Sequence, residues 1–441
     1  MTPRETALHV VRDVFQADAS QDRGAQESLE YRSQKGELDA RDRAFCTNLV
    51  FGAIKMRRTL DWYLQPYVGG RDKALPPVIA EILRLAIYEL QFTAAKDHAV
   101  VSEWVNLAKR YGHRGTAGLV NAVLRGFLRD RPAAPAPEDF DNEDDYLGTL
   151  YSYPTWIVRQ WRAVFGSEQL VDVLKACNEP AQPAATVNRA KGTRAELQTW
   201  FAQREVKTQP SELAEDSLLL EGGALAAAGQ GESGEAWWLQ SESSAMVVDV
   251  LNPQPDDKVI DACTGRGNKA LQIAARIGDE RPVLCIDRDR RKIQMLEKRA
   301  TAAGLAVEAV AEDATVPVTT QRADRILIDA PCSGLGVLGR HPEARWRKRP
   351  DDGERLALTQ RALLDALAPQ LYEGGAIVYA VCSTDPRETT DVIEWFLGAY
   401  NVERGLIPAH FAELQTPAGD LLVPPGLQGR DGFYVARLER R

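Results

Sequence analysis

The sequence predicts a multidomain chain: an all-helical N-terminal domain, a small α/β subdomain and a doubly wound α/β domain. The length of 441 residues exceeds what one hydrophobic core usually organises. Apolar residues recur every three or four positions through the first part of the chain. Beyond residue 258, short aliphatic runs alternate with helical stretches. We place the domains at 1–130, 151–240 and 241–441, with a linker at 131–150.

The first domain is predicted to be helical from Arg4 to about Arg129. Its clearest segment carries Ile79, Ile82 and Leu83 at helical spacing and follows a pair of prolines at 76 and 77. Proline fits the first turn of a helix, so this pattern indicates a buried helix that begins there.

A proline-rich and then acidic run, 131–145, follows the helical domain and has no periodicity. We expect an exposed linker there. Beyond it, residues 156–174 have a helical pattern and 184–188 read as a short strand. Thr193 and Glu196 then form the signature of a capping box, which indicates a helix in the small subdomain.

The last domain is predicted to hold a parallel sheet. Its expected strands are 258–263, 282–287, 306–310, 324–330 and 376–382, with helices such as 288–303 and 353–367 between several of them. In such a sheet, ligands bind beyond the carboxyl ends of the strands. The motifs described next all follow such an end.

Composition restricts the function classes. The formal net charge of −9 argues against indiscriminate nucleic-acid binding, so a nucleic-acid partner must meet a local basic surface. No apolar run is long enough for a membrane span, and the start lacks a signal peptide, so we expect a cytoplasmic protein with no membrane partner. The six cysteines are scattered, so we expect free thiols and no metal. We expect a monomer.

A candidate cofactor loop runs from Asp261 to Lys269, where a strand ends and a helix begins. Its glycines let the backbone approach a ligand, and the helix start presents free amides. Taken alone, the loop is also compatible with a simple tight turn. Asp287 ends the next strand, where a carboxylate can bond both hydroxyls of a ribose.

These features favour a nucleoside ligand without phosphates. The glycines are too few for the dinucleotide fingerprint, and a phosphate-binding loop is absent, so S-adenosylmethionine fits better than NAD or ATP. Asp313, after the third strand, could meet the adenine amino group. The candidate cofactor-binding residues are Cys263, Thr264, Gly265, Arg266, Gly267, Asn268, Lys269, Asp287, Asp313 and Asp329.

Two cysteines carry the candidate chemistry. Cys332 follows the fourth strand within Asp329-Ala-Pro-Cys-Ser-Gly, and Cys382 ends the fifth, so both thiols should face one crevice. A buried cysteine alone is usually a small apolar side chain, but two at adjacent strand ends beside an aspartate favour covalent catalysis. A thiol needs a nearby cation or helix amides to ionise at neutral pH, and Lys269 is the candidate cation.

At these residues the sequence resembles the RNA cytosine-5 methyltransferase family, whose motifs are Asp-Ala-Pro-Cys-Ser-Gly and Thr-Cys-Ser followed by Pro-x-Glu. The resemblance implies a Rossmann-like catalytic domain in which Cys382 adds to carbon 6 of cytosine and Cys332 assists product release. Asp329 would hold the edge of the ring. The stretches 41–52, 83–88 and 120–125 look like a helical RNA-binding domain of the NusB type, and this architecture implies 16S ribosomal RNA as the partner.

Two positions depart from the family pattern. The first motif usually reads Cys-Ala-Ala-Pro-Gly-Gly-Lys-Thr, whereas here Cys263, one glycine and Lys269 remain. Val381 stands where a threonine usually precedes the nucleophile. We expect altered cofactor contacts and retained activity.

The predicted RNA-binding run follows the Cys332 loop and combines cations with an aromatic ring. It comprises Arg340, Arg345, Trp346, Arg347, Lys348 and Arg349. A solvated charged loop is the alternative. Two other functions stay open at this point: a transfer-RNA cytosine methyltransferase, and a non-catalytic RNA-binding protein of ribosome assembly motivated by the altered first motif.

Overall fold

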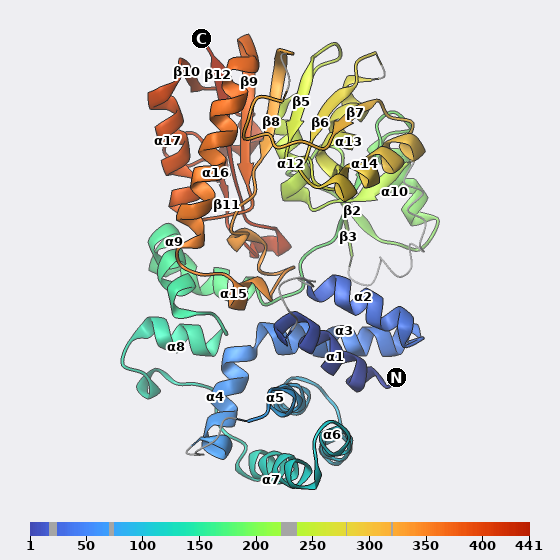
Figure 1. The fold of residues 1–441 in the computed structure, drawn as a ribbon, viewed down its shortest axis with the longest axis vertical. Helices are drawn as coiled ribbons and strands as arrows, with labels where there is room; N and C mark the ends of the chain where they lie inside the picture. The colour runs from blue at the N-terminus through green and yellow to red at the C-terminus, as the bar shows by residue number, and fades with distance from the viewer. Residues whose placement is uncertain (17–23, 70–74, 222–235, 279, 319–320) are drawn as a thin grey trace. The chain divides into compact units, whose positions relative to one another are not determined.

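The computed structural model describes residues 1–16, 24–69, 75–221, 236–278, 280–318 and 321–441 (Figure 1). These residues form two compact units. The first consists of Met1–Ala163 together with the short segment His341–Arg347, and the second of Val164–Arg340 and Lys348–Arg441. Each unit is described by itself below.

The first unit is helical, as the sequence predicts. Its N-terminal helices are α1 (Pro3–Gln16), α2 (Ala25–Lys35), α3 (Ala40–Lys55), α4 (Arg57–Val68), α5 (Pro77–Phe92), α6 (Asp97–Tyr111) and α7 (Arg114–Asp130). The expected helix after the proline pair is α5, which begins at Pro77. It carries buried Ile79, Ile82 and Leu83 and belongs to the core formed by α1 to α7.

The expected exposed linker is wrong over its last part, where α8 (Glu143–Leu150) forms. Asn142 caps this helix through its side chain, and three carboxylates stand in the first turn, where the helix dipole favours negative charge. Asp145 also bonds Arg58 of α4 at 3.0 Å. The acidic residues 143–145, which the composition predicts to lie in a solvated linker, therefore form the first turn of a packed helix.

The next helix, α9 (Thr155–Ala176), covers the predicted range and contains a break at Gly166, whose φ is 73°. The chain returns to the first unit at His341–Arg347, which includes the short helix α15 (Ala344–Arg347).

This returning segment corrects the predicted RNA-binding run. Arg345 is fully buried, with its guanidinium carbon 3.9 Å from the centre of the Tyr153 ring, and it donates to the carbonyls of Lys55 and Ser152. Trp346 packs against the helical core, and its indole nitrogen donates to the Ile54 carbonyl at 2.8 Å.

The remaining residues of that run differ in their surroundings. Arg347 donates to the Val14 carbonyl at 2.6 Å, and Arg340, in the second unit, pairs with Asp431 at 2.8 Å. The prediction is therefore wrong for Arg345 and Trp346, and Arg340 and Arg347 already have partners within the protein. Lys348 is half-buried and Arg349 exposed, so for these two the prediction stands untested.

The second unit begins with a small antiparallel sheet in the order β2-β3-β1-β4. Its strands are β1 (Ala184–Val187), β2 (Thr208–Pro210), β3 (Ser217–Leu220) and β4 (Trp237–Leu239), with α10 (Arg194–Ala202) packed against them. The predicted strand is β1. The predicted capping box is present, because Thr193 and Glu196 exchange hydrogen bonds between side chain and backbone.

The large sheet of the second unit has the order β10-β12-β9-β8-β5-β6-β7, with β11 paired to β12. Its strands are β5 (Val259–Ala262), β6 (Val283–Ile286), β7 (Val307–Val310), β8 (Ala323–Asp329), β9 (Leu371–Val381), β10 (Val402–Arg404), β11 (Leu421–Val423) and β12 (Phe433–Arg440). The five predicted strands are β5 to β9, which are parallel to one another. The antiparallel strands β10 to β12 were not predicted.

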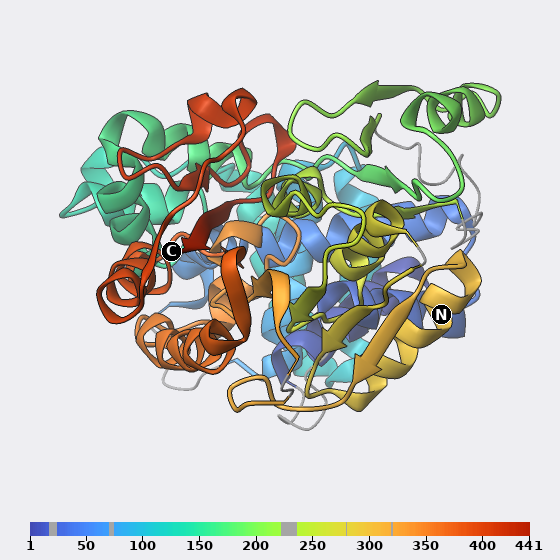
Figure 2. The same ribbon diagram turned by 90° about the horizontal axis from the view of Figure 1, so that it is seen from above.

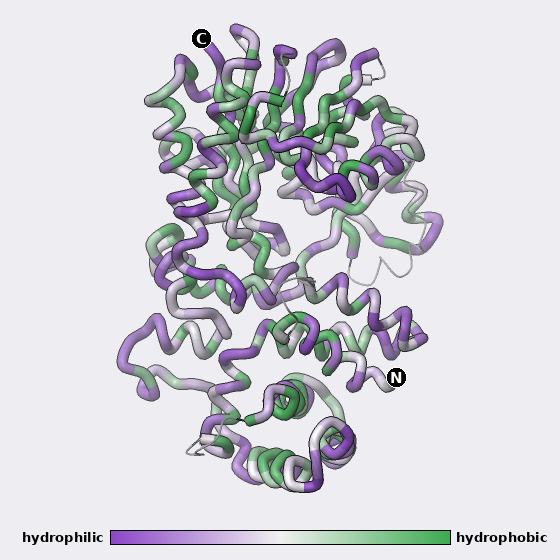
Figure 3. The backbone as a smooth tube through the Cα atoms, in the orientation of Figure 1, coloured by the Kyte–Doolittle hydropathy of each residue, from purple (hydrophilic) through white to green (hydrophobic). Residues whose placement is uncertain are grey.

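Helices cover both faces of this sheet. They are α12 (Glu242–Leu251), α13 (Asn268–Ile277), α14 (Arg290–Ala303), α16 (Asp352–Leu367) and α17 (Thr390–Ala399). Alternate residues of each strand enter two separate cores, one with α12 to α14 and one with α16 and α17. Figure 2 shows the sheet between these layers, and Figure 3 shows hydrophobic residues concentrated along the strands. The predicted doubly wound fold is confirmed.

Within the ranges that the structure describes, no helix is both long and apolar enough to cross a bilayer.

We predict that Arg345→Ala loosens the first unit. The change leaves the Lys55 and Ser152 carbonyls without this donor and opens a cavity beside Tyr153, which together cost about 2–4 kcal/mol. Hydrogen exchange of peptides from α3, α4 and α9 should become faster. Arg349→Gln, an exposed change in the same run, is the control. Unchanged exchange in Arg345→Ala would show that the buried guanidinium does not hold the unit together.

Candidate active site

The candidate site lies at the carboxyl ends of β5, β6, β8 and β9. The chain order runs from β5 through β6 to β7 on one side and from β8 to β9 on the other, so the direction of winding changes between β5 and β8. In doubly wound sheets this switch leaves a crevice for ligands.

The loop after β5 is held close to its neighbours. Cys263, Gly265 and Gly267 all have positive φ, of 63°, 60° and 85°. A Cβ atom on Gly267 would come within 2.3 Å of the Leu296 side chain of α14, so a larger residue would push the two apart. The Thr264 amide donates to the Ile286 carbonyl at 2.9 Å, which joins the loop to the end of β6.

Asp287 is buried at the end of β6 and holds this loop. Its carboxylate accepts from the Gly265 amide at 2.9 Å and from the Asp289 amide at 2.8 Å. Lys292 of α14 lies 3.8 Å from it. A carboxylate accepts more than two hydrogen bonds, so Asp287 keeps capacity for a ligand.

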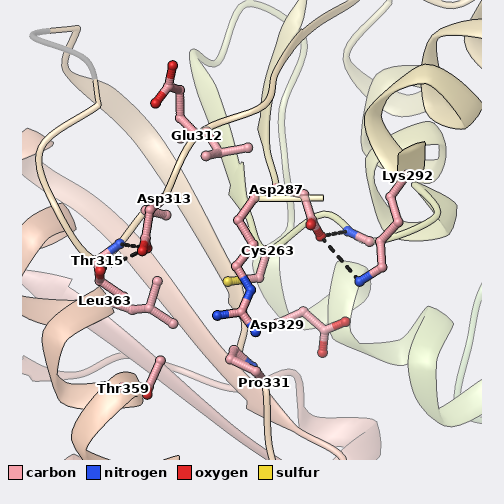
Figure 4. A pocket seen from close by; sticks show the side chains of 14 residues that line it. Cys263, Asp287, Lys292, Glu312, Asp313, Thr315, Asp329, Pro331, Thr359 and Leu363 are labelled. Atoms are coloured by element: carbon pink, nitrogen blue, oxygen red, sulfur yellow. Dashed lines mark hydrogen bonds and ion pairs between the residues drawn. The ribbon is translucent and has the colours of Figure 1, made fainter. Parts of the chain in front are cut away.

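A cavity of about 420 Å³ opens beside these residues (Figure 4). It brings together five predicted cofactor residues, Cys263, Gly265, Asp287, Asp313 and Asp329. Figure 4 shows Asp287 and Lys292 on one side, and Asp313 with Thr315 on the other. The sequence did not single out the other lining residues: Ile286, Arg288, Lys292, Glu312, Ala314, Thr315, Pro331, Thr359 and Leu363. Arg288 could have been noticed, because it directly follows Asp287.

Asp313 is exposed and accepts hydrogen bonds from the Thr315 amide and hydroxyl, which lower the pKa of Asp313. It is therefore a carboxylate at neutral pH, able to accept a hydrogen bond from an amino group in the cavity.

The other predicted cofactor residues do not line the cavity. Thr264 donates from its hydroxyl to Asp261, and Asn268 donates to the Leu239 carbonyl. Arg266 is exposed, and Lys269 is buried. These side chains shape the loop.

Asp261 is a buried carboxyl group that the sequence analysis treated only as the start of the loop. Burial raises the pKa of Asp261 to about 7, and its Oδ1 atom accepts no hydrogen bond from the described residues. Such an unsatisfied acceptor beneath a loop is a place where a bound polar group lowers the free energy.

Lys269 was expected to assist ionisation of Cys382. Its ammonium group is instead paired with Asp329 at 2.6 Å and lies 5.4 Å from the centre of the Phe433 ring. Lys269 therefore fixes the carboxylate of Asp329 at the end of β8. Among the described residues, the Lys269 ammonium group makes no hydrogen bond with a cysteine.

The two predicted catalytic cysteines meet at the ends of β8 and β9. The sulfur atoms of Cys332 and Cys382 lie 3.2 Å apart, and both residues are half-buried. A hydrogen bond donated by Cys332 to the Cys382 sulfur, together with burial, raises the pKa of Cys332 well above its usual value. Cys332 therefore holds its proton tightly, and that proton can be donated to the Cys382 sulfur.

Backbone contacts bring the two cysteine loops together. The Gly336 amide donates to the Cys382 carbonyl at 3.0 Å, and the Gly432 amide donates to the Gly336 carbonyl at 2.7 Å. A Cβ atom on Gly336 would lie 2.1 Å from the Gly432 carbonyl oxygen, so only glycine permits this approach.

Glu388, the glutamate of the Pro-x-Glu motif, links the two cysteine loops through hydrogen bonds. It is fully buried and accepts from the Ser333 amide at 2.8 Å, from the Ser333 hydroxyl and from the Ser383 hydroxyl at 2.6 Å. The two hydroxyls also lie 2.9 Å apart. Since Ser333 follows Cys332 and Ser383 follows Cys382, this carboxylate fixes the separation of the thiols.

A nucleoside-sized cavity at the switch point of a doubly wound sheet, beside paired cysteines, defines a methyltransferase-like site. The model of the family described as 16S rRNA methyltransferase RsmB/F matches residues 248–439. The NusB family model matches residues 1–129, and a ferredoxin-like domain model of RsmF/B-like methyltransferases matches 153–225.

Curated relatives match over nearly the whole chain. A probable ribosomal RNA small subunit methyltransferase B of Bacillus subtilis is 32% identical, over 92% of this chain and 93% of that protein. The ribosomal RNA small subunit methyltransferase B of Thermus thermophilus is 36% identical, over 100% and 98%. The chain therefore belongs to the RsmB/F family of methyltransferases.

Solved structures share the fold. The crystal structure of PH0851 has a TM-score of 0.82 at 21% identity and covers 100% of this chain and 99% of that chain. NSun6 from Pyrococcus horikoshii, solved with SFG, has a TM-score of 0.59 at 19% identity and covers 66% and 99%.

We predict that Glu388→Ala slows methyl transfer without unfolding the protein. Losing the common acceptor frees the two cysteine loops, and a misplacement of about 1 Å at reacting atoms can cost roughly 100-fold in rate. The rate at which the oxidant diamide forms a disulfide between Cys332 and Cys382 should also fall. This rate depends on the separation of the two thiols. Glu388→Gln should recover part of both rates, because its amide oxygen still accepts.

Asp391→Ala, an exposed acid on neighbouring α17, is the matched control. If Glu388→Ala closed the disulfide as fast as this control, the carboxylate would not set the thiol geometry.

Proposed function

We propose that this protein transfers a methyl group from S-adenosylmethionine to carbon 5 of a cytosine in 16S ribosomal RNA through a covalent adduct with Cys382. The observation that carries the proposal is the pair of thiols, 3.2 Å apart, at the edge of the sheet where Asp329 also lines the cavity. We expect it to act in the cytoplasm, where ribosomes are assembled.

The residues around the cavity fit this cofactor. Its volume of about 420 Å³ lies in the range of small-molecule sites. Asp287 and Asp313 both line the cavity, which supports Asp287 as the candidate acceptor for the ribose hydroxyls and Asp313 for the adenine amino group. NSun6 with SFG, an analogue of S-adenosylmethionine, shows such a ligand on a related fold.

When bound, S-adenosylmethionine supplies an electrophilic methyl group on sulfur. The chain must make carbon 5 nucleophilic, and Cys382 does so by bonding its sulfur to carbon 6. Asp329, held by Lys269, is the candidate to hydrogen-bond the ring edge during this addition. Cys332 lies beside the adduct, and once it has released its own proton to solvent, its thiolate is the candidate base for the proton on carbon 5. Removal of the carbon 5 proton lets the bond between the Cys382 sulfur and carbon 6 break, which regenerates Cys382.

The substrate assignment rests on the domains and relatives. A NusB-type domain precedes the catalytic domain, and relatives that match over nearly the whole chain are ribosomal RNA small subunit methyltransferases. Bisulfite mapping of ribosomal and transfer RNA, with and without the protein, tests this. If 5-methylcytosine appeared only in transfer RNA, the substrate would be transfer RNA rather than ribosomal RNA. If no 5-methylcytosine appeared in either RNA, a non-catalytic role would be favoured.

We predict opposite outcomes for the two cysteines. Cys382→Ala should abolish methyl transfer, because no adduct can form. Cys332→Ala should form the adduct and release it poorly, so a denaturant-stable band of protein and RNA should accumulate on a gel. A band with Cys382→Ala and none with Cys332→Ala would show that the two roles are exchanged.

We also predict that Asp287→Ala weakens S-adenosylmethionine binding about 10- to 100-fold, the effect of losing charge-assisted hydrogen bonds of about 1.5–3 kcal/mol. Calorimetric titration measures it. Glu354→Gln, an exposed acid on α16, should bind as the unchanged protein does. An unaltered dissociation constant for Asp287→Ala would show that its carboxylate does not face the cofactor.

A further inference from the structure

Helix α14 and the residues before it form an exposed basic surface, which we call the α14 ridge. It consists of Arg266, Arg288, Arg290, Arg291 and Lys298, all exposed. The opposite side of the helix carries the buried residues Ile293, Leu296, Ala300 and Ala303. Because burial fixes the rotation of the helix, Arg291 and Lys298, seven positions apart, share its outer side.

The cations of the α14 ridge differ in their pairing from other arginines of the second unit. Among the residues that the structure describes, none of the five side chains makes an ion pair or a hydrogen bond, whereas Arg276, Arg404 and Arg430 of the same unit are all paired. Asp287 accepts from two amides and Asp289 caps α14, while Glu312 and Asp313 line the same cavity as Arg288. Glu297 is the remaining exposed acid on the helix.

This concentration of unpaired charge is notable in a chain with a formal net charge of −9. Like charges held together on one helix repel one another, which costs free energy in the isolated protein. An anion with regularly spaced charges removes that cost. A nucleic-acid backbone is such an anion, and its binding also gains from the release of condensed counterions.

The ridge is well placed relative to the cavity. Arg288, the first residue after Asp287, lines the cavity, and α14 begins at the carboxyl end of β6. From β6 to β9, where Cys382 follows, the sheet order crosses three strand spacings, roughly 14 Å. A strand of RNA with one base at the cysteines can therefore reach the start of α14 within a few nucleotides, and Lys298 lies about 12 Å further along the helix.

We propose that the α14 ridge binds the phosphate backbone of single-stranded RNA beside the nucleotide that enters the site. The inference rests on the proposed function, because it takes the RNA substrate from there. We place the main contact with RNA here rather than at Arg340, Arg345 and Arg347, which already have partners within the protein. Arg290, Arg291 and Lys298 contact phosphates, and exposed Met295 between them offers apolar contact to a base or sugar.

The test is the triple variant Arg290→Gln, Arg291→Gln and Lys298→Gln in the full chain, with a single-stranded RNA oligonucleotide of mixed sequence as the probe. We expect RNA affinity to fall roughly 10-fold or more at low salt. The slope of log affinity against log salt should flatten by about 2, or about 0.7 for each lost contact. S-adenosylmethionine affinity should not change.

The control is Lys207→Gln, Arg355→Gln and Arg441→Gln, which removes equal charge from exposed, paired positions of the same unit. It should keep the RNA affinity and salt slope of the unchanged protein. If the ridge variant also kept both, the proposal would be overturned and the ridge would be solvated surface.

The two proposals can fail separately. If the unchanged protein made no 5-methylcytosine in any RNA yet bound RNA through these side chains, only the proposed function would fail. If methylation occurred and the ridge variant bound RNA normally, only the ridge would fail.

Discussion

The buried carboxylate of Glu388 is the constraint on which the candidate site depends. A carboxylate removed from water must receive hydrogen bonds or lose its charge, and burial raises the pKa of Glu388 while the donors oppose that rise. Apart from Gln360, its recorded side-chain donors belong to Ser333 and Ser383. The need to satisfy one buried charge therefore pulls two strand ends together and sets the separation of the cysteines that follow them.

The sequence predicts the parallel part of the fold because burial on both faces leaves a clear pattern. Strands β5 to β8 lie within about a residue or two of their expected ranges, and β9 begins five residues before its expected start, at Leu371. The antiparallel strands β10 to β12 were missed because β10 and β11 have only 3 residues each, and charged residues such as Arg437 and Glu439 interrupt β12. Helix α8 was missed because a capped, acidic first turn has the composition of a linker.

The candidate site was predictable to the extent that topology determines it. Parallel strands place Cys332 and Cys382 at one edge, and the structure brings them together there. The partner of Lys269 was not predictable, since pairing with Asp329 depends on side-chain directions that spacing does not encode. The prediction that Arg345 and Trp346 bind RNA was wrong for a related reason. Composition shows that arginines are present but not which of them are buried, and Arg345 lies beneath a tyrosine ring with two carbonyls as acceptors.

Pairing, rather than the number of cations in a run, therefore distinguishes structural from functional basic residues in this acidic chain. Arg345 donates to backbone carbonyls and Arg340 pairs with Asp431. The charge of each guanidinium group is therefore neutralised or shielded within the protein. The five cations of the α14 ridge make no ion pair or hydrogen bond with a described residue, although a net charge of −9 makes carboxylates abundant. Unpaired arginines beside a cavity keep their field directed at solvent, where it can attract a polyanion and orient it toward the carboxyl edge of the sheet.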